Sequence, residues 1–126
     1  MGKILVVEDS PRLLRLAEEA IRPLGHEVLH APSAEKGLDV LMEHQVDLII
    51  AEYRMSGVDG MQFLYRLRKE KITAPFVFAA SFIPQQVKEA AALLGVREYI
   101  DRNYPRIQVQ KMIMRVMELE HRKHEK

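Results

Sequence analysis

Charged residues follow several short apolar runs of this sequence, at positions where strands of a parallel sheet would end. Glu8 and Asp9 follow the first run, Glu52 follows the third, and Arg54 comes two residues later. Arg102 follows the fifth run. Because the carboxyl ends of parallel strands meet at one edge of a sheet, we expect these side chains to lie together. Three carboxylates at one edge could bind a divalent cation or be neutralised by the two arginines.

The elements that must position these residues alternate between short apolar runs and longer segments of helical periodicity, which is the pattern of βα units. The predicted strands are Ile4–Val7, Glu27–His30, Val46–Ala51, Phe76–Ala79 and Glu98–Ile100. The first, third and fourth runs are almost wholly apolar, as in parallel strands that are covered on both faces. Right-handed crossovers between them predict an α/β fold with a three-layer, doubly wound sheet.

Residues with capping chemistry predict where the intervening helices begin. The signals are Ser10 followed by Pro11, Ser33, Asp59, Pro84 and Pro105. No linker, repeat or low-complexity segment interrupts the alternation of strands and helices. We therefore expect one domain over residues 1–126.

The composition excludes several classes of protein. The chain has 126 residues, of which 48% are hydrophobic and 29% charged, the balance of a globular protein rather than a disordered one. A formal net charge of +1, with no basic stripe interleaved with aromatics, argues against direct nucleic-acid binding. The absence of cysteine excludes disulfides and thiolate metal sites. We find no signal peptide and no apolar run of membrane-spanning length, so we expect a cytoplasmic protein without membrane contact.

Four segments together resemble the receiver domain of bacterial two-component response regulators, over nearly the whole chain. They are ILVVEDSPRLLRL, VDLIIAEYRMSGVDG, APFVFAAS and GVREYIDRNYP. The resemblance implies a flavodoxin-like (βα)5 sandwich with a five-stranded parallel sheet of order 2-1-3-4-5. It also implies a Mg²⁺-binding acidic pair at Glu8 and Asp9, a phosphoacceptor position at Glu52, and switch positions at Ala80, Tyr99 and Arg102.

Three positions depart from the pattern of that family, which has aspartate at the position of Glu52, Ser or Thr at Ala80, and lysine at Arg102. The extra methylene of glutamate moves the nucleophilic oxygen away from the in-line geometry that suits aspartate. Ala80 offers no hydroxyl to a phosphoryl group, and Arg102 presents a planar fork instead of a compact ammonium. We therefore predict an atypical (pseudo-)receiver in which Glu52 is a permanent negative group, held by Arg102 and Arg54 and not phosphorylated.

Such a domain would not be an enzyme, and would act by binding a sensor kinase, an output domain or another signalling protein. No cofactor is required in this interpretation, although Glu8, Asp9 and Glu52 could form a weak Mg²⁺ site. One alternative is a functional receiver in a His-Asp phosphorelay that uses Glu52 as its phosphoacceptor. Another is a small-ligand-binding doubly wound domain, which the lack of a G-x-G-x-x-G or P-loop motif disfavours.

The last predicted helix has apolar residues on two faces. One stripe follows helical periodicity and should face the sheet; it contains Val109, Met112, Ile113, Val116 and Met117. Ile107 and Met114 are seven residues apart and share a face roughly opposite that stripe. The resemblance points to the same face, which receivers use for dimers and targets. We expect Tyr99, Ile107 and Met114 to form an interaction surface for a homodimer or a protein partner.

Overall fold

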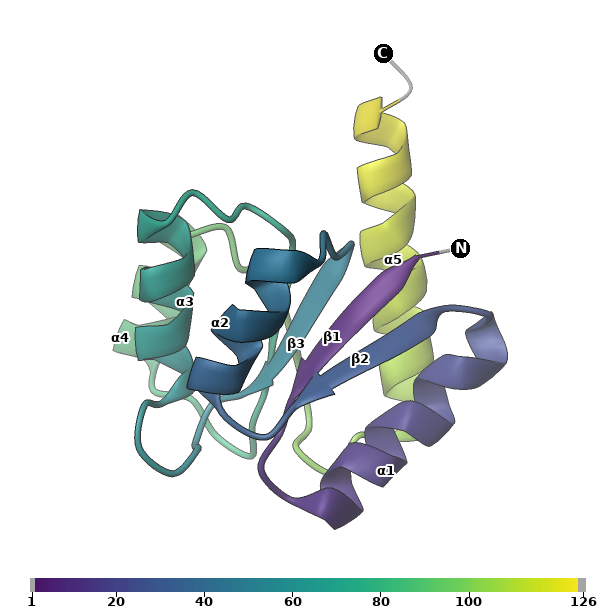
Figure 1. The fold of residues 1–126 in the computed structure, drawn as a ribbon, viewed down its shortest axis with the longest axis horizontal. Coiled ribbons are helices and arrows are strands. Elements are labelled where there is room, and N and C mark those ends of the chain that lie inside the picture. Colours follow the sequence, from purple (N-terminus) through teal and green to yellow (C-terminus); the bar gives the residue numbers. More distant parts are fainter. Residues whose placement is uncertain (1, 125–126) are drawn as a thin grey trace.

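The computed structural model describes residues 2–124, which form a five-stranded parallel sheet between two layers of helices (Figure 1). The strands are β1 (Lys3–Val7), β2 (Glu27–Ala31), β3 (Leu48–Glu52), β4 (Phe76–Ala79) and β5 (Glu98–Ile100). The helices are α1 (Pro11–Ile21), the 3₁₀ turn η1 (Arg22–Leu24), α2 (Ala34–Glu43), α3 (Gly60–Lys69), α4 (Gln85–Leu93) and α5 (Arg106–His124). The strand order β2-β1-β3-β4-β5 confirms the predicted flavodoxin-like, doubly wound architecture.

The third strand differs most from its predicted bounds, and the difference matters for the site. It begins at Leu48 because Asp47 is used to hold the start of β1, where its carboxylate accepts from the Lys3 N–H at 2.8 Å. It ends at Glu52 instead of Ala51, and every residue of the strand is buried. The sheet therefore carries the carboxyl of Glu52 into the protein rather than leaving it in the following loop.

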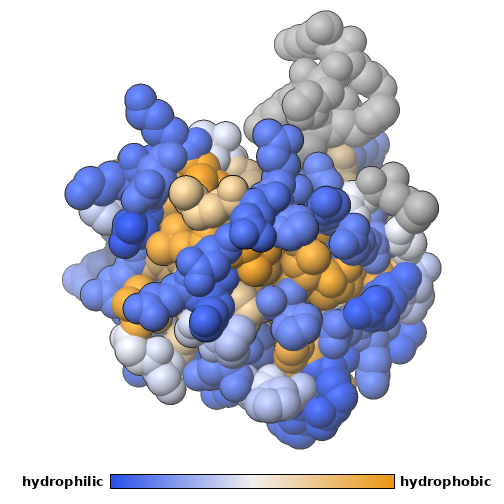
Figure 2. Space-filling view, viewed as in Figure 1, coloured by the Kyte–Doolittle hydropathy of each residue, from blue (hydrophilic) through white to orange (hydrophobic). Residues whose placement is uncertain are grey.

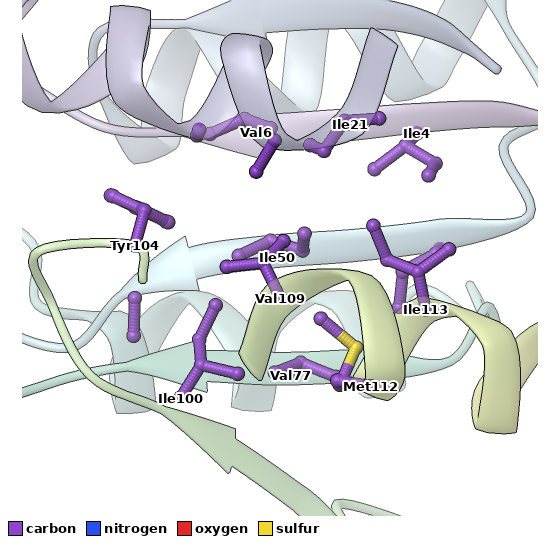
Figure 3. Close-up of a cluster of buried hydrophobic side chains, with 14 of the residues drawn as sticks. Ile4, Val6, Ile21, Ile50, Val77, Ile100, Tyr104, Val109, Met112 and Ile113 are labelled. Atoms are coloured by element: carbon purple, nitrogen blue, oxygen red, sulfur yellow. The ribbon is translucent and has the colours of Figure 1, made fainter. Parts of the chain in front are cut away.

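Each face of the sheet packs a separate apolar cluster against its helices. Helices α1 and α5 cover one face, and α2, α3 and α4 cover the other (Figure 1). On the first face, side chains from all five strands belong to the same cluster as the predicted stripe of α5, part of which is seen in Figure 3. Val109, Met112, Ile113 and Val116 in that stripe are buried and Met117 is partly buried, so the predicted stripe is confirmed. The apolar face of α5 thus anchors the loop that precedes it.

Side-chain caps fix the helix starts near the carboxyl ends of the strands. The hydroxyls of Ser10 and Ser33 each accept from the backbone N–H three residues later, at 3.2 Å. Asp59 forms a capping box with Gln62, with bonds of 2.9 and 3.1 Å. These caps confirm the predicted starts of α1, α2 and α3. The loops between strand ends and helix starts are therefore short and held in place.

Charged and polar side chains cover most of the face in Figure 2, with apolar residues visible between them. Within residues 2–124, no helix combines the length and apolar character needed to cross a membrane.

Candidate functional site

Three carboxyl groups converge where β1 and β3 end. The two strands are neighbours in register, with Val7 opposite Ala51, so Glu8 and Glu52 follow side by side. One oxygen from each of Glu8, Asp9 and Glu52 lies within 4.8 Å of the others. The structure thus brings together the three acids that sequence reasoning placed at this edge.

The loop after β3 approaches the strand end so closely that Gly60 has no room for a side chain. A Cβ at Gly60 would lie 2.7 Å from the Glu52 carbonyl oxygen and 2.8 Å from the Phe78 ring. The Gly60 N–H donates to the Tyr53 carbonyl at 2.8 Å, which closes the loop. This close approach holds the loop beside the carboxyls.

Glu52 is the buried end of the site, with only 3% of its surface exposed. Its Oε1 lies 3.2 Å from Nη2 of Arg102, whose side chain is 45% exposed. Its Oε2 is buried and has no hydrogen-bond partner among the described residues. The carboxyl is therefore held by arginine through one oxygen, while the other is left without a partner among the described residues.

The environment of Glu52 favours the neutral carboxyl. Burial, and after it the neighbouring Glu8, raise its pKa to about 9, and Arg102 only partly opposes this shift. This environment favours the protonated form of Glu52 at neutral pH, whereas the sequence-based interpretation took Glu52 as a permanent negative group. The reason is that the strand buries the group more completely than one exposed guanidinium can compensate.

Asp9 lies at the solvent side of the site. It is exposed, and its Oδ2 accepts from the Ser56 N–H at 3.3 Å and from the Ser56 hydroxyl at 3.5 Å. Ser56 belongs to the loop after β3, so this pair ties the ends of β1 and β3 together across the opening. The three acids therefore differ in environment: Glu8 and Glu52 are buried, and Asp9 is exposed.

A small cavity of about 120 Å³ lies beside Glu52. Its lining includes Arg54, Ala80, Ser81 and Arg102. Arg54 is exposed and forms no ion pair with an acid among the described residues, so only Arg102 meets the expectation that both arginines hold Glu52. Ala80 lines the cavity with a methyl group and therefore offers no hydroxyl to it. The cavity is far smaller than the pockets that hold drug-sized ligands, which run from roughly 300 to 1,000 Å³.

Tyr104 is the site residue that sequence reasoning missed. Its hydroxyl donates to Oε1 of Glu8 at 2.8 Å, and both residues are buried, with 3% and 2% exposed. The second oxygen of Glu8 accepts from the Ser10 N–H at 3.1 Å. A signal was available, because a tyrosine in the loop after the last strand has the reach to bring a hydroxyl back to the strand ends.

The predicted interaction residues lie away from the carboxyls. Ile107 and Met114 are 65% and 61% exposed on α5. Tyr99 is half-buried: its ring stacks on Phe78 with centroids 6.2 Å apart, and the ammonium of Lys88 lies 5.3 Å from its centroid. The ring is thus held between the sheet and α4, and the two α5 side chains face solvent.

Comparison with known proteins gives one consistent match. The family model of the response regulator receiver domain matches residues 4–114. The chain is 35% identical to the transcriptional regulatory protein GlrR of Escherichia coli K12 over 101 residues, which are 79% of this chain and 22% of that protein. It is 28% identical to the heme response regulator HssR of Staphylococcus saprophyticus over 116 residues, 92% of this chain and 50% of that protein.

The fold comparison agrees with the family match. The chemotaxis protein CheY4 of Vibrio cholerae superposes with a TM-score of 0.85 at 20% identity, covering 92% of this chain and 98% of that one. At this identity the likeness bears on the fold alone. The chain spans between about a fifth and a half of the length of the two regulators named above.

Proposed function

The chain belongs to the family of response regulator receiver domains of two-component systems, and from this premise we propose that it is a pseudo-receiver that signals without being phosphorylated. The observation that carries the proposal is the state of Glu52 at the phosphoacceptor position, a buried carboxyl bound by Arg102 at 3.2 Å. In this proposal the domain has no catalytic activity. It acts in the cytoplasm by binding other proteins, and it contacts neither nucleic acid nor membrane.

Three features of the site support this proposal. A carboxyl group attacks phosphorus as the anion, and the raised pKa of Glu52, about 9, leaves little anion at neutral pH. The guanidinium of Arg102 occupies one of its two oxygens. Ala80, in the cavity beside it, has no hydroxyl to hold a transferred phosphoryl group.

Mass spectrometry after treatment with acetyl phosphate and Mg²⁺ tests the proposal. The expected result is an unchanged mass, since Glu52 is mostly protonated at neutral pH and Ala80 offers no hydroxyl to a phosphoryl group. A mass gain of one phosphoryl group that disappears in Glu52→Gln would instead establish the alternative, a phosphorelay receiver that uses glutamate.

Within the same proposal, Glu8, Asp9 and Glu52 would bind a divalent cation weakly. Carboxylate oxygens are the ligands that Mg²⁺ prefers, and the unused Oε2 of Glu52 is a buried acceptor that a cation would satisfy. A bound cation would supply positive charge between the carboxyls. The affinity should be low, because Glu52 must first lose its proton and Arg102 already contributes positive charge at this site.

We further propose that Ile107, Met114 and Tyr99 contact a protein partner, either a second copy of the chain, a sensor kinase or an output domain. Two large apolar side chains exposed together on one helix face indicate such a contact. Ile107→Glu with Met114→Glu should abolish the association and leave the melting temperature nearly unchanged, since both side chains are exposed.

Light scattering and melting curves check this prediction. The matched control is Met42→Glu, a change of equal character at a residue that is 75% exposed on α2, away from α5. An association that survives the double change, or a double variant that unfolds, would place the working surface elsewhere.

A further inference from the structure

Tyr104 and Glu8 form a buried hydrogen bond between residues 96 positions apart in the sequence. The phenol donates at 2.8 Å to Oε1, and the Ser10 N–H donates at 3.1 Å to Oε2. Both oxygens of Glu8 therefore already accept a donor from the protein. Glu52 differs, since its Oε2 has no partner among the described residues.

The backbone and the core together hold Tyr104 in this position. Its φ of 53° lies in the left-handed region, which costs a non-glycine residue on the order of 1–2 kcal/mol. Its ring lies at one end of the cluster that packs Val6, Ile100 and Val109 (Figure 3). Because the ring is fixed by this packing, the hydroxyl cannot leave Glu8 without disturbing the cluster between the sheet and α5.

The direction of this hydrogen bond decides its effect on a cation. The O–H group points its partial positive charge at Glu8, which lowers the negative potential that would attract a divalent ion. This effect is large in a buried site, where electrostatic interactions are weakly screened. A phenol keeps its proton at neutral pH, so Tyr104 remains a hydrogen-bond donor to Glu8.

We propose that Tyr104 is a positioning residue of the candidate cation site: its hydroxyl binds Glu8 and thereby weakens the binding of a divalent cation between Glu8, Asp9 and Glu52. This inference rests on the proposed cation site and goes beyond it, because it assigns a control on affinity to a residue that is itself not a ligand. The loop between β5 and α5 thus gives Glu8 a donor from the protein, where a cation would otherwise supply positive charge.

Calorimetric titration with Mg²⁺ tests the inference through Tyr104→Phe, which removes the hydroxyl and keeps the ring. Loss of one buried hydrogen bond to a charged group should lower the Kd for Mg²⁺ about tenfold relative to the wild type. The control is Tyr65→Phe, an equal change at a residue that is 64% exposed, which should leave the Kd unchanged. An equal or higher Kd in Tyr104→Phe would overturn the inference.

A spectroscopic readout tests the same point in the folded wild-type protein. The chain has four tyrosines and no tryptophan, so a near-ultraviolet difference spectrum reports on tyrosine. Saturating Mg²⁺ should produce a tyrosine difference signal that persists in Tyr65→Phe and is absent in Tyr104→Phe. A wild-type protein with no signal, or a signal that survives in Tyr104→Phe, contradicts the role of Tyr104. If the wild type does not bind Mg²⁺ at all, both this inference and the proposed cation site are wrong. The proposal that the domain is not phosphorylated would be unaffected, because mass spectrometry tests it separately.

Discussion

The free energy of unfolding should fall by about 2 kcal/mol between pH 7 and pH 9, because Glu52 keeps its proton in the fold over most of this range while the unfolded chain has already released it. The folded pKa of about 9 lies above the ordinary value of 4.5, so the folded state binds one more proton than the unfolded state between these values. The stabilising contribution is fully present below pH 4.5 and is lost as the pH rises through about 9. The total stability of a domain is only about 5–15 kcal/mol, so this is a large effect.

Glu52→Gln should remove this pH dependence, because glutamine is neutral at every pH in the range. We expect denaturant unfolding curves of Glu52→Gln and wild type to diverge from pH 7 to pH 9 by about the same 2 kcal/mol, with the variant more stable at the upper end. The window begins at pH 7 because His26, whose pKa is lowered mainly by burial, acts in the opposite direction below its ordinary value of 6.5.

The matched control is Glu89→Gln on the exposed surface of α4, which should track the wild type across the range. Parallel curves for Glu52→Gln and wild type would show that Glu52 is ionised in the fold at neutral pH. Such a result would support the sequence-based interpretation, in which Glu52 is permanently charged.

Restoring phosphorylation should require three changes at once. Glu52→Asp alone places a shorter carboxyl beside Ala80 and Arg102, neither of which presents the hydroxyl or the ammonium that this family uses. The combination of Glu52→Asp, Ala80→Thr and Arg102→Lys should accept a phosphoryl group from acetyl phosphate about 100-fold faster than the single variant, the scale of loss that misplacement near a reacting centre produces.

Initial rates of phosphorylation, read by mass spectrometry, compare the two proteins. A double variant with only Ala80→Thr and Arg102→Lys is the control, and it should remain unmodified because Glu52 is unchanged. If Glu52→Asp performs as well as the triple variant, the pocket around Glu52 is not what prevents the reaction.

The fold was predictable because it depends on hydrophobic periodicity and capping residues, which can be recognised in the sequence without atomic coordinates. The buried runs of β1, β3 and β4 and the caps at Ser10, Ser33 and Asp59 fixed where strands end and helices begin. Since carboxyl ends of parallel strands share an edge, the meeting of Glu8, Asp9 and Glu52 followed from the same patterns.

The charge state of the site was not predictable in this way, because it depends on degrees of burial and on single contacts. One residue of extra strand length places Glu52 at 3% exposure and raises its pKa. The hydrogen bond from Tyr104 to Glu8 depends on a left-handed backbone angle at Tyr104, which the identity of the residue does not predict. Arg54 and Arg102 are equivalent as sequence letters, yet only Arg102 forms an ion pair among the described residues.

The protonation state of Glu52 at neutral pH is the point on which the account depends most. A carbon-13 NMR titration of the glutamate carboxyl carbons, with the Glu52 signal assigned by its loss in Glu52→Gln, measures this state directly in Mg²⁺-free buffer. We predict the chemical shift of a protonated carboxyl at pH 7 and a titration midpoint near pH 9. A midpoint near the ordinary glutamate value of 4.5 would contradict the account, because Glu52 would then be an available anion at the phosphoacceptor position.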